Sequence, residues 1–592
     1  MKKILSVLLI IYTFNLNAQN TYRSPLDIPL VLSANFGELR PNHFHSGIDL
    51  KTQGVINKPV YSIADGYVSR VSVSPSGYGL AIYVAHTNGQ TSVYGHIEKF
   101  APKIAGYVKE KQYEQESYRV DLSLDQSVFP VKKGDLIAYS GNTGSSGGPH
   151  VHFEIRDTES QLALDALEYY KGQIEDNVPP VVKGYAVYPV EGKGVVNNSY
   201  EPFRRIVGAT QGKKGAKVIP DSIKVWGKIG IGVYANDRMT GTSNIYGVKV
   251  VRLFCDGKEI FFSDISSVDF GNTRMINSMI DFDYWYRKKS FYQKSFIEPG
   301  NKLPIYKTVN DGYIDINEEK VYKLKYELED LYGNKTTHSF DVYGKKQDIP
   351  RRKDCTQLMA RDQENHYEGN MFSISIAGGS LYKDLCFNLK RTLSKNYMSA
   401  TYEVSDSYVP LDKSCDITIK MTKDSMTNKS QYGIVRITGS RESWIGGKYN
   451  NGAVTAHIRE LGNTYAVAID AEAPTITPVL PAKWVAKGEI KIRLSDNKSG
   501  IASYRGTIDG AFALFENDVK SPVYTYKFDP KRLTRGQTHK LVFTATDACG
   551  NESSYEYEFK YYGLISKFGS ADFQFINTLS NPYYSFLPFR IF

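Results

Sequence analysis

The sequence predicts an all-β protein made of several domains. Its 592 residues are too many for a single hydrophobic core. Aromatic residues account for 13% of the chain, which is typical of strands, whereas the long Leu, Ala and Glu runs typical of helices are scarce. Short apolar stretches alternate with Gly, Asn and Asp turns. We therefore expect a small antiparallel β-sheet core, followed by two or three immunoglobulin-like β-sandwich domains.

Residues 1–18 have the layout of a secretory signal peptide. Lys2 and Lys3 precede an apolar run, and the small residue Ala18 marks the expected cleavage site. No cysteine lies near this position, so we do not expect a lipid anchor. No second apolar run of this length follows, so we expect no transmembrane segment in the mature chain. The protein is thus predicted to be exported, and to be periplasmic, associated with the outer envelope, or secreted.

The net charge and the cysteine content limit the partners, metal sites and disulfides that we expect. The formal net charge of +10 is a small excess for a chain of this size, so we expect a mixed solvated surface and no nucleic-acid partner. The five cysteines contain no C-x-x-C pair, which argues against a cysteine zinc site. One or two disulfides in the middle of the chain would suit an oxidising compartment.

The first expected domain covers residues 19–172, with a core at 35–156. It contains short strand-like stretches separated by glycine turns, among them GYVSRVSV, LAIYVAH, TSVYGH and HVHFEI. Such strands indicate a compact antiparallel sheet structure. A polar stretch at 109–127 interrupts the pattern, and we expect it to form an inserted surface loop or hairpin.

The rest of the chain contains a loose internal repeat. Three stretches of the first copy each resemble a stretch of the second copy, in the same order. The first-copy stretches are EDNVPPVVKGYAVYP, VYANDRMTG and YELEDLYGNKT, and their counterparts are DAEAPTITPVLP, RLSDNKSG and FTATDACGNES. Three signals that repeat in one order indicate a duplicated module. We predict immunoglobulin-like β-sandwiches at 178–346 and 474–562, with a further β-rich domain at 350–470 between them. The aromatic tail at 563–592 has no predicted structure.

The repeated signals contain aspartates that invite comparison with calcium sites. Asp237, Asp330, Asp496 and Asp547 each lie in an Asp/Asn/Gly turn. No complete calcium-loop pattern surrounds any of them. We therefore expect these aspartates to stabilise turns through hydrogen bonds to nearby backbone groups.

Histidines are concentrated in the first quarter of the chain, where six of the ten precede residue 153. Alternate side chains of a strand share a face, so His150, His152 and Glu154 of HVHFEI point the same way. The apolar residues between them point the other way and can pack in a core. Two imidazoles on one strand face, after the glycine-rich stretch GNTGSSGGP, indicate a site rather than packing.

The stretch HFHSGIDL supplies further metal-binding side chains. His45 and Asp49 are four residues apart and can reach one metal ion if the segment is extended. Imidazole nitrogen and carboxylate oxygen both suit zinc. These two residues with either His150 or His152 would provide three protein ligands, which leaves a fourth position for a nucleophilic water. His96 and the remaining histidine would then assist proton transfer and stabilise the oxyanion.

The order of these motifs resembles that of the lysostaphin/LytM-type zinc endopeptidases. The resemblance rests on six motifs, which are HSGIDL, ADGYV, GYGLAIYVAHTNG, VYGHI, VKKGDLIAYSGNTG and GPHVHFEI. Members of this family are peptidoglycan hydrolases with a small antiparallel β core. The resemblance implies that His45, Asp49 and His152 bind one Zn²⁺ ion. It further implies that His96 and His150 are the catalytic histidines, without deciding which of them is the base.

One hypothesis about function stands above two alternatives. We expect an exported zinc metallo-endopeptidase that hydrolyses peptide cross-links of peptidoglycan, with the C-terminal β modules contacting envelope proteins or glycans. The first alternative is a non-catalytic envelope scaffold that regulates other cell-wall hydrolases. The second is a zinc protease that acts on protein substrates. All five positions of the family's metal and histidine set are present, which favours the first hypothesis.

Four further polar residues of the first domain have competing interpretations. His43 is expected to face solvent or substrate rather than the metal, and His86 to make a structural hydrogen bond. Glu154 either holds a ligand imidazole or forms a surface ion pair. Arg40 either contacts an acidic group of the substrate or pairs with Glu38.

Overall fold

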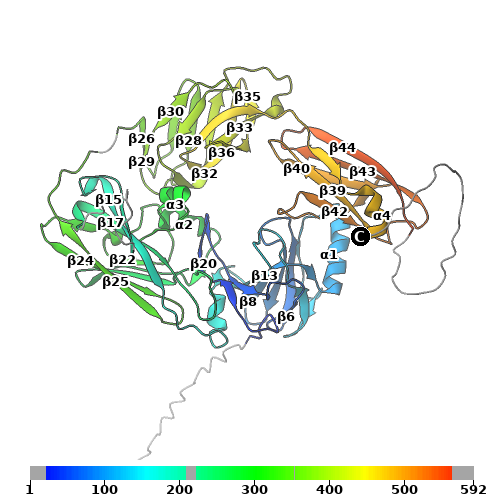
Figure 1. The fold of residues 1–592 in the computed structure, drawn as a ribbon, viewed down its shortest axis with the longest axis horizontal. Coiled ribbons are helices and arrows are strands. Elements are labelled where there is room, and N and C mark those ends of the chain that lie inside the picture. Colours follow the sequence, from blue (N-terminus) through cyan, green and yellow to red (C-terminus); the bar gives the residue numbers. More distant parts are fainter. Residues whose placement is uncertain (1–21, 209–221, 352–353, 563–592) are drawn as a thin grey trace, which may run out of the picture.

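The structure is a computed structural model that describes residues 22–208, 222–351 and 354–562. The predicted signal peptide at 1–18 and the tail at 563–592 lie outside these residues. The described chain is mostly β, as predicted, and Figure 1 shows successive antiparallel sheets with a few short helices. No helix in this part of the chain is long and apolar enough to span a membrane.

The first domain is built on an antiparallel sheet whose strands lie in the order β1-β4-β13-β8-β7-β6-β10. Val151, Phe153 and Ile155 alternate along β13 and are fully buried on one face. The opposite face of the same strand carries its polar side chains. The strands of this sheet are β1 Leu32–Ala34, β4 Ile48–Lys51, β13 His150–Asp157, β8 Gln90–Ile97, β7 Leu80–His86, β6 Gly66–Val73 and β10 Val120–Ser123.

A three-stranded sheet in the order β5-β12-β9 shares its core with the larger sheet. Val60 and Ile137 of this small sheet belong to the same buried cluster as Ile82 and Tyr94 of the larger one. The remaining elements of the domain are small: β2 Leu39–Arg40, β3 His43–Phe44, β5 Pro59–Tyr61, β9 Lys99–Phe100, β11 Pro130–Val131, β12 Leu136–Tyr139, β14 Ala163–Leu164 and the 3-10 helix η1 Ala166–Tyr169.

The polar stretch at 109–127 does not form the predicted surface loop or hairpin. Its first part completes helix α1, Pro102–Glu114, and its second part contains β10, which pairs with β6. Proline is favoured at the start of a helix, where its missing amide proton costs no hydrogen bond. The prediction was wrong because Lys, Glu and Gln, which make the stretch polar, are also good helix formers. One face of the helix is buried at four-residue spacing by Ile104, Val108 and Gln112.

The next part of the chain forms two β layers that are joined along one edge. The long strands β15 and β17 pair with each other, and β17 continues into the second layer through a short parallel pairing with β25. Val187, Ile231 and Leu324 are buried between the layers. The strands are β15 Val181–Val196, β16 Phe203–Ile206, β17 Lys224–Asn236, β18 Val250–Cys255, β19 Lys258–Asp264, β21 Gln293–Lys294, β22 Tyr306–Thr308, β23 Ile314–Ile316, β24 Val321–Glu329 and β25 Lys335–Gly344.

A partly helical segment interrupts these layers, and the sequence did not predict it. The backbone amide of Phe44 donates to Thr273 Oγ1 at 2.9 Å, and Arg274 Nε donates to the Leu411 carbonyl at 3.0 Å. The segment therefore ties the first domain to the domain that follows the two layers. Its elements are β20 Ser267–Val268, η2 Thr273–Met275, α2 Ile276–Met279, α3 Phe282–Lys288 and η3 Asn310–Gly312.

The following domain consists of two five-stranded sheets around one core. Their orders are β27-β28-β32-β36-β35 and β30-β31-β37-β33-β34. A disulfide joins Cys355 to Cys386 at the start of this domain. The elements are β26 Gln357–Met359, β27 Asn365–Glu368, β28 Phe372–Ile376, β29 Leu385–Phe387, β30 Leu389–Thr392, β31 Thr401–Val404, β32 Val409–Lys420, η4 Lys429–Gln431, β33 Tyr432–Thr438, β34 Arg441–Gly446, β35 Lys448–Asn450, β36 Ala453–Leu461 and β37 Thr464–Ile469.

The last domain has a three-stranded sheet, β38-β39-β42, and a four-stranded sheet, β41-β40-β43-β44. Ile490, Phe515 and Phe543 belong to the core that the two sheets share. The elements are β38 Thr475–Pro478, η5 Pro481–Lys483, α4 Trp484–Lys487, β39 Glu489–Ser495, β40 Ile501–Ile508, β41 Ala511–Ala513, β42 Val523–Lys527, β43 Thr538–Asp547 and β44 Glu552–Lys560.

The last domain lies beside helix α1 of the first domain (Figure 1). The rings of Tyr113 and Phe512 are 5.8 Å apart between centroids, and Lys109 Nζ lies 2.8 Å from Asp529 Oδ2. The last domain also reaches the loop after β12, where a backbone amide donates to Asp518 Oδ2 at 2.8 Å. The chain therefore curves back on itself, so its last domain contacts its first.

Candidate metal centre

Strand β13 brings the two histidine-containing motifs of the sequence together. On one side it pairs with β4, where Asp49 lies directly opposite His152. On its other side it pairs with β8, where Gly95 lies opposite the same histidine. Directly opposed residues of paired strands point to the same face, so Asp49 and His152 share the polar face of the sheet. His45 reaches this face from the segment just before β4.

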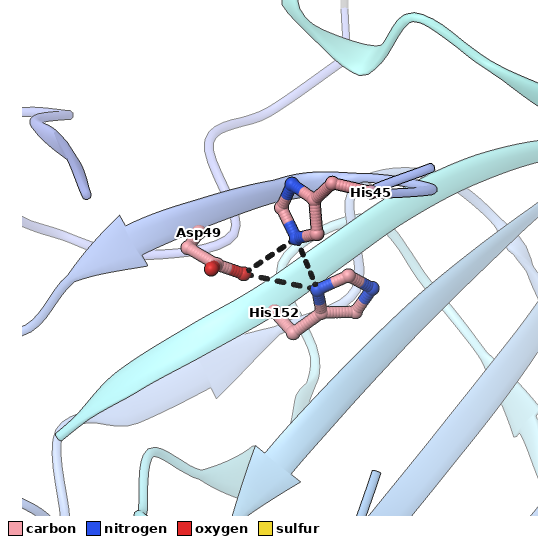
Figure 2. Close-up of side chains that lie close together, drawn as sticks. All are labelled: His45, Asp49 and His152. Carbon is pink, nitrogen blue, oxygen red and sulfur yellow. Dashed lines mark hydrogen bonds and ion pairs between the residues drawn. The ribbon is translucent and has the colours of Figure 1, made fainter. Parts of the chain in front are cut away.

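Three potential ligand atoms converge on one point (Figure 2). His45 Nε2 lies 3.1 Å from both Asp49 Oδ1 and His152 Nδ1, and the last two atoms are 2.9 Å apart. A tetrahedral zinc site with bonds of about 2.0–2.1 Å spaces its ligand atoms about 3.3 Å apart. The three side chains are only 9%, 13% and 4% exposed. Their spacing and burial therefore fit one small divalent ion.

The outer ring nitrogens determine how the two imidazoles present their lone pairs. His45 Nδ1 lies 2.7 Å from the Asn35 carbonyl oxygen, and His152 Nε2 lies 2.8 Å from Glu154 Oε1. Each outer nitrogen donates its proton to an oxygen, so in the neutral rings the inner nitrogens carry lone pairs. Two lone pairs and a carboxylate oxygen then face one another without a proton between them. This arrangement is unfavourable unless a cation lies among the three atoms.

Protonation of His152 relieves this conflict when no cation is bound. Burial lowers the pKa of His152, but hydrogen bonds to Asp49 and Glu154 outweigh burial and raise it to about 9. Burial raises the pKa of Asp49, yet the neighbouring histidines hold it well below its usual range. A zinc ion would therefore displace a proton from His152 on binding.

His96 reaches the same face through a bulge in β8. Gly95 lies opposite His152, so the next residue of a regular strand would point to the opposite face. The pairing of β7 with β8 shifts register between Leu80 and Ile82, and His96 has a left-handed backbone with φ of +57°. The bulge turns the imidazole back, so its ring centroid lies 5.9 Å from that of His152.

His96 and His150 lie side by side at the edge of the three convergent side chains. Their ring centroids are 4.9 Å apart. His96 Nδ1 donates to the Thr143 carbonyl and His150 Nδ1 to the Gly148 carbonyl, each at 2.8 Å, which leaves both Nε2 atoms as acceptors. Burial, with the nearby histidines His152 and His150, lowers the pKa of His96 to about 3. The His96 imidazole is therefore neutral at pH 7 and can accept a proton.

Comparison with known families places this site in a recognised class. The sequence model of peptidase family M23 matches residues 43–113 and 122–164, a span that contains all five predicted site residues. The chain carries an M23 peptidase domain. M23 peptidases depend on zinc, and the three convergent side chains form a candidate site for that ion. A model described as a Zu5-like domain matches residues 356–470.

Curated relatives match about a fifth of the chain. An uncharacterized metalloprotease of Haemophilus influenzae is 34% identical over 120 residues, which are 20% of this chain and 19% of the relative. The peptidoglycan DD-endopeptidase ShyB of Vibrio cholerae is 32% identical over 111 residues, 19% of this chain and 20% of the relative. The catalytic domain of lysostaphin from Staphylococcus simulans is 23% identical, over 26% of this chain and 95% of that chain, with a TM-score of 0.18. This chain thus spans about a fifth of the length of the curated relatives it matches.

Glu154 belongs to the interior of the M23 site rather than to the surface. It is fully buried and accepts hydrogen bonds from His152 Nε2 at 2.8 Å, from Ser46 Oγ at 2.7 Å and from Arg156 Nε at 2.6 Å. Burial raises the pKa of Glu154, but the hydrogen bonds and charges of His152 and Arg156 outweigh burial and lower it far below its usual range. The ionised carboxylate therefore fixes the orientation of the His152 ring.

Some residues that support the M23 site were not singled out from the sequence. The ring of Tyr78 stacks on His152 with 5.0 Å between centroids, and its hydroxyl donates to Glu154. Arg156 follows Glu154 on the same face of β13, so strand alternation could have identified it. Tyr78 comes from the turn before β7, and no local pattern distinguishes it from other tyrosines.

His43, His86 and Arg40, which the sequence singled out, lie outside the metal centre. His43 is exposed, and its Nδ1 donates to the Pro41 carbonyl at 2.8 Å. His86 is buried and makes two structural hydrogen bonds, as expected. Arg40 pairs with Glu38, with 3.3 Å between the charged groups.

Proposed function

We propose that this chain is an exported, zinc-dependent endopeptidase that hydrolyses peptide cross-links of peptidoglycan. The observation that carries the proposal is the convergence of His45, Asp49 and His152, whose inner donor atoms lie within 3.1 Å of one another. The M23 match supports the reaction class. The peptidoglycan DD-endopeptidase among the relatives supports the substrate class.

In this proposal His45, Asp49 and His152 hold the zinc ion. Zinc bound at these side chains would activate water as a nucleophile and polarise the scissile carbonyl. The Asn35 carbonyl and the Glu154 carboxylate keep the outer ring protons in place, so both imidazoles present lone pairs inward. Because this arrangement is built in advance, little reorganisation is needed when substrate binds.

His96 and His150 move the proton. The Thr143 carbonyl holds the His96 ring by Nδ1, which leaves Nε2 to take a proton from the attacking water. The same proton passes to the amine nitrogen that leaves as the peptide bond breaks. The neighbouring His150 ring, when protonated, donates to the oxyanion of the tetrahedral intermediate. His150 Nε2 also lies 3.4 Å from Asp49 Oδ1, so this ring stands next to the proposed ligand carboxylate.

The proposal places the protein outside the cytoplasm. Peptidoglycan is an envelope polymer, and the Cys355–Cys386 disulfide fits an oxidising compartment. Residues 1–18 are proposed to form the signal peptide that directs export. The β domains that follow the M23 domain are proposed to contact envelope proteins or glycans and thereby to position the peptidase.

Digestion of purified sacculi tests the proposed function. We expect the zinc-loaded protein to release soluble muropeptides with new amino groups and without new reducing ends, because peptide bonds rather than glycosidic bonds are cut. A chelator should abolish the release, and added zinc should restore it. Undiminished release in the presence of chelator would contradict the zinc mechanism. Zinc-loaded protein that digests unrelated proteins but not sacculi would favour a general protease, and protein that only stimulates another hydrolase would favour a regulator.

A further inference from the structure

Aspartates far apart in the sequence converge at the entrance to each repeated module. Asp176, Asp237 and Asp330 offer carboxylate oxygens that all lie within 4.8 Å of one another. The corresponding residues of the second copy do the same, and they are Asp470, Asp496 and Asp547. Local turn chemistry alone, which the sequence led us to expect, does not explain why three separate turns meet.

The fold explains the convergence. Asp176 lies in the segment that enters the first module, Asp237 directly follows β17, and Asp330 directly follows β24. Asn334 Nδ2 fastens the group by donating to the Asp176 carbonyl at 3.1 Å and to Asp330 Oδ2 at 2.8 Å.

The second module contains the same two hydrogen bonds with the same donor–acceptor distances. Asn551 Nδ2 donates to the Asp470 carbonyl at 3.1 Å and to Asp547 Oδ2 at 2.8 Å. The cluster is therefore a property of the module and not an accident of one junction.

The first cluster contains buried carboxylate oxygens that have no hydrogen-bond partner. Asp237 is 4% exposed and its Oδ1 has none, and Asp176 is 6% exposed and its Oδ2 has none. Lys249 lies near this cluster, but its Nζ is 3.5 Å from Asp165 Oδ2. Burial, with the nearby charges of Asp330 and Asp176, raises the pKa of Asp237 to about 8. Three close, buried carboxylates without a counter-charge are costly, and a bound cation removes that cost.

The cluster also faces a cavity that a cation can enter. All three aspartates line this cavity, which is partly open to solvent. Asn35 and Phe36 of the first domain also line it. The cavity therefore lies at the junction between the M23 domain and the first module.

We propose that Asp176, Asp237 and Asp330 bind a calcium ion at this junction. The donors are oxygens only, which suits a hard cation and disfavours zinc. Calcium accepts irregular sets of carboxylate and carbonyl oxygens, whereas magnesium demands a near-ideal octahedron and holds its water. The bound ion ties the entering segment to two strand ends of the module. It thereby fixes the orientation of the M23 domain relative to the first module.

Hydrogen exchange of the zinc-loaded full chain, with and without calcium, tests this proposal. Calcium should slow exchange in the entering segment, residues 172–180, and Asp237→Asn should remove that protection. Asp341→Asn is the matched control, because Asp341 is an exposed residue of the same module, on β25, and should keep full protection. Magnesium at the same concentration should protect the segment less than calcium.

A melting experiment separates a ligand role from a purely structural one. Asparagine has the shape of aspartate but no charge, so in chelator Asp237→Asn should melt at or above the wild-type temperature. With calcium, the wild type should gain stability and the variant should gain less. The proposal is overturned if calcium leaves exchange at 172–180 unchanged in the wild type, if Asp237→Asn keeps wild-type protection, or if magnesium protects better than calcium.

Discussion

Replacing Glu154 by glutamine tests how far the M23 metal centre depends on a residue that does not itself bind the ion. Glu154 is fully buried and accepts the Nε2 proton of His152 at 2.8 Å and the Nε proton of Arg156 at 2.6 Å. Glutamine keeps the shape and one oxygen but loses the negative charge. His152 then becomes a weaker donor to zinc, and the buried Arg156 loses its counter-charge.

The expected loss follows from these contacts. Removing the partner that orients a ligand histidine costs about 10- to 100-fold in metal affinity. This loss corresponds to about 1.4–2.8 kcal/mol at 25 °C. The bond between His152 and Glu154 is fully shielded from water, so we expect the upper part of this range. The unpaired Arg156 costs about 3 kcal/mol of folding stability in addition, so circular dichroism must show that the variant is folded at the assay temperature.

Competition with a chromophoric zinc chelator measures the affinity directly. Glu159→Gln is the matched control, because Glu159 is exposed in the turn after β13 and should bind zinc like the wild type. A folded Glu154→Gln protein that binds zinc within about twofold of the wild type would refute the reasoning.

Two further perturbations probe proton linkage and contact between domains. Because its pKa is raised to about 9, His152 of the zinc-free protein is still mostly protonated at pH 8, where an ordinary imidazole is neutral. Zinc binding should therefore release about one proton at pH 8 and progressively fewer above pH 9. Calorimetry in buffers of different ionisation enthalpy measures this number, and no release at pH 8 would contradict the assigned protonation. Asp518→Ala removes the acceptor of the Gly144 amide, so hydrogen exchange in the loop 141–149 should become faster, and unchanged exchange would show that the contact does not hold the loop.

Strand alternation is local, and this is why part of the metal centre could be predicted from the sequence. His150, His152 and Glu154 were placed on one face from their spacing alone, and they share that face in β13. The register that puts Asp49 opposite His152 depends on pairing between strands about a hundred residues apart, which local patterns do not encode. The choice of His152 over His150 as a ligand came from family resemblance and remains part of the proposal.

Other features escaped prediction for different physical reasons. His96 reaches the site through a bulge with a left-handed residue, and a regular strand would have turned it away. Helix α1 was mistaken for a loop because a polar composition fits both a solvated helix and a loop. Four of the six clustered aspartates were recognised as turn residues one at a time, Asp176 and Asp470 were not singled out, and only the tertiary fold shows that the aspartates meet.

The most direct test of the central claim separates metal binding from turnover in two variants. After exposure to one equivalent of zinc, the wild type and His96→Ala should each retain one zinc ion per chain, whereas Asp49→Ala should lose it. In the sacculus assay, Asp49→Ala should be inactive, and His96→Ala should be slower by about 100-fold or more although its metal is in place. Asp49→Ala protein that keeps its zinc, or His96→Ala protein that digests sacculi at the wild-type rate, would contradict the account.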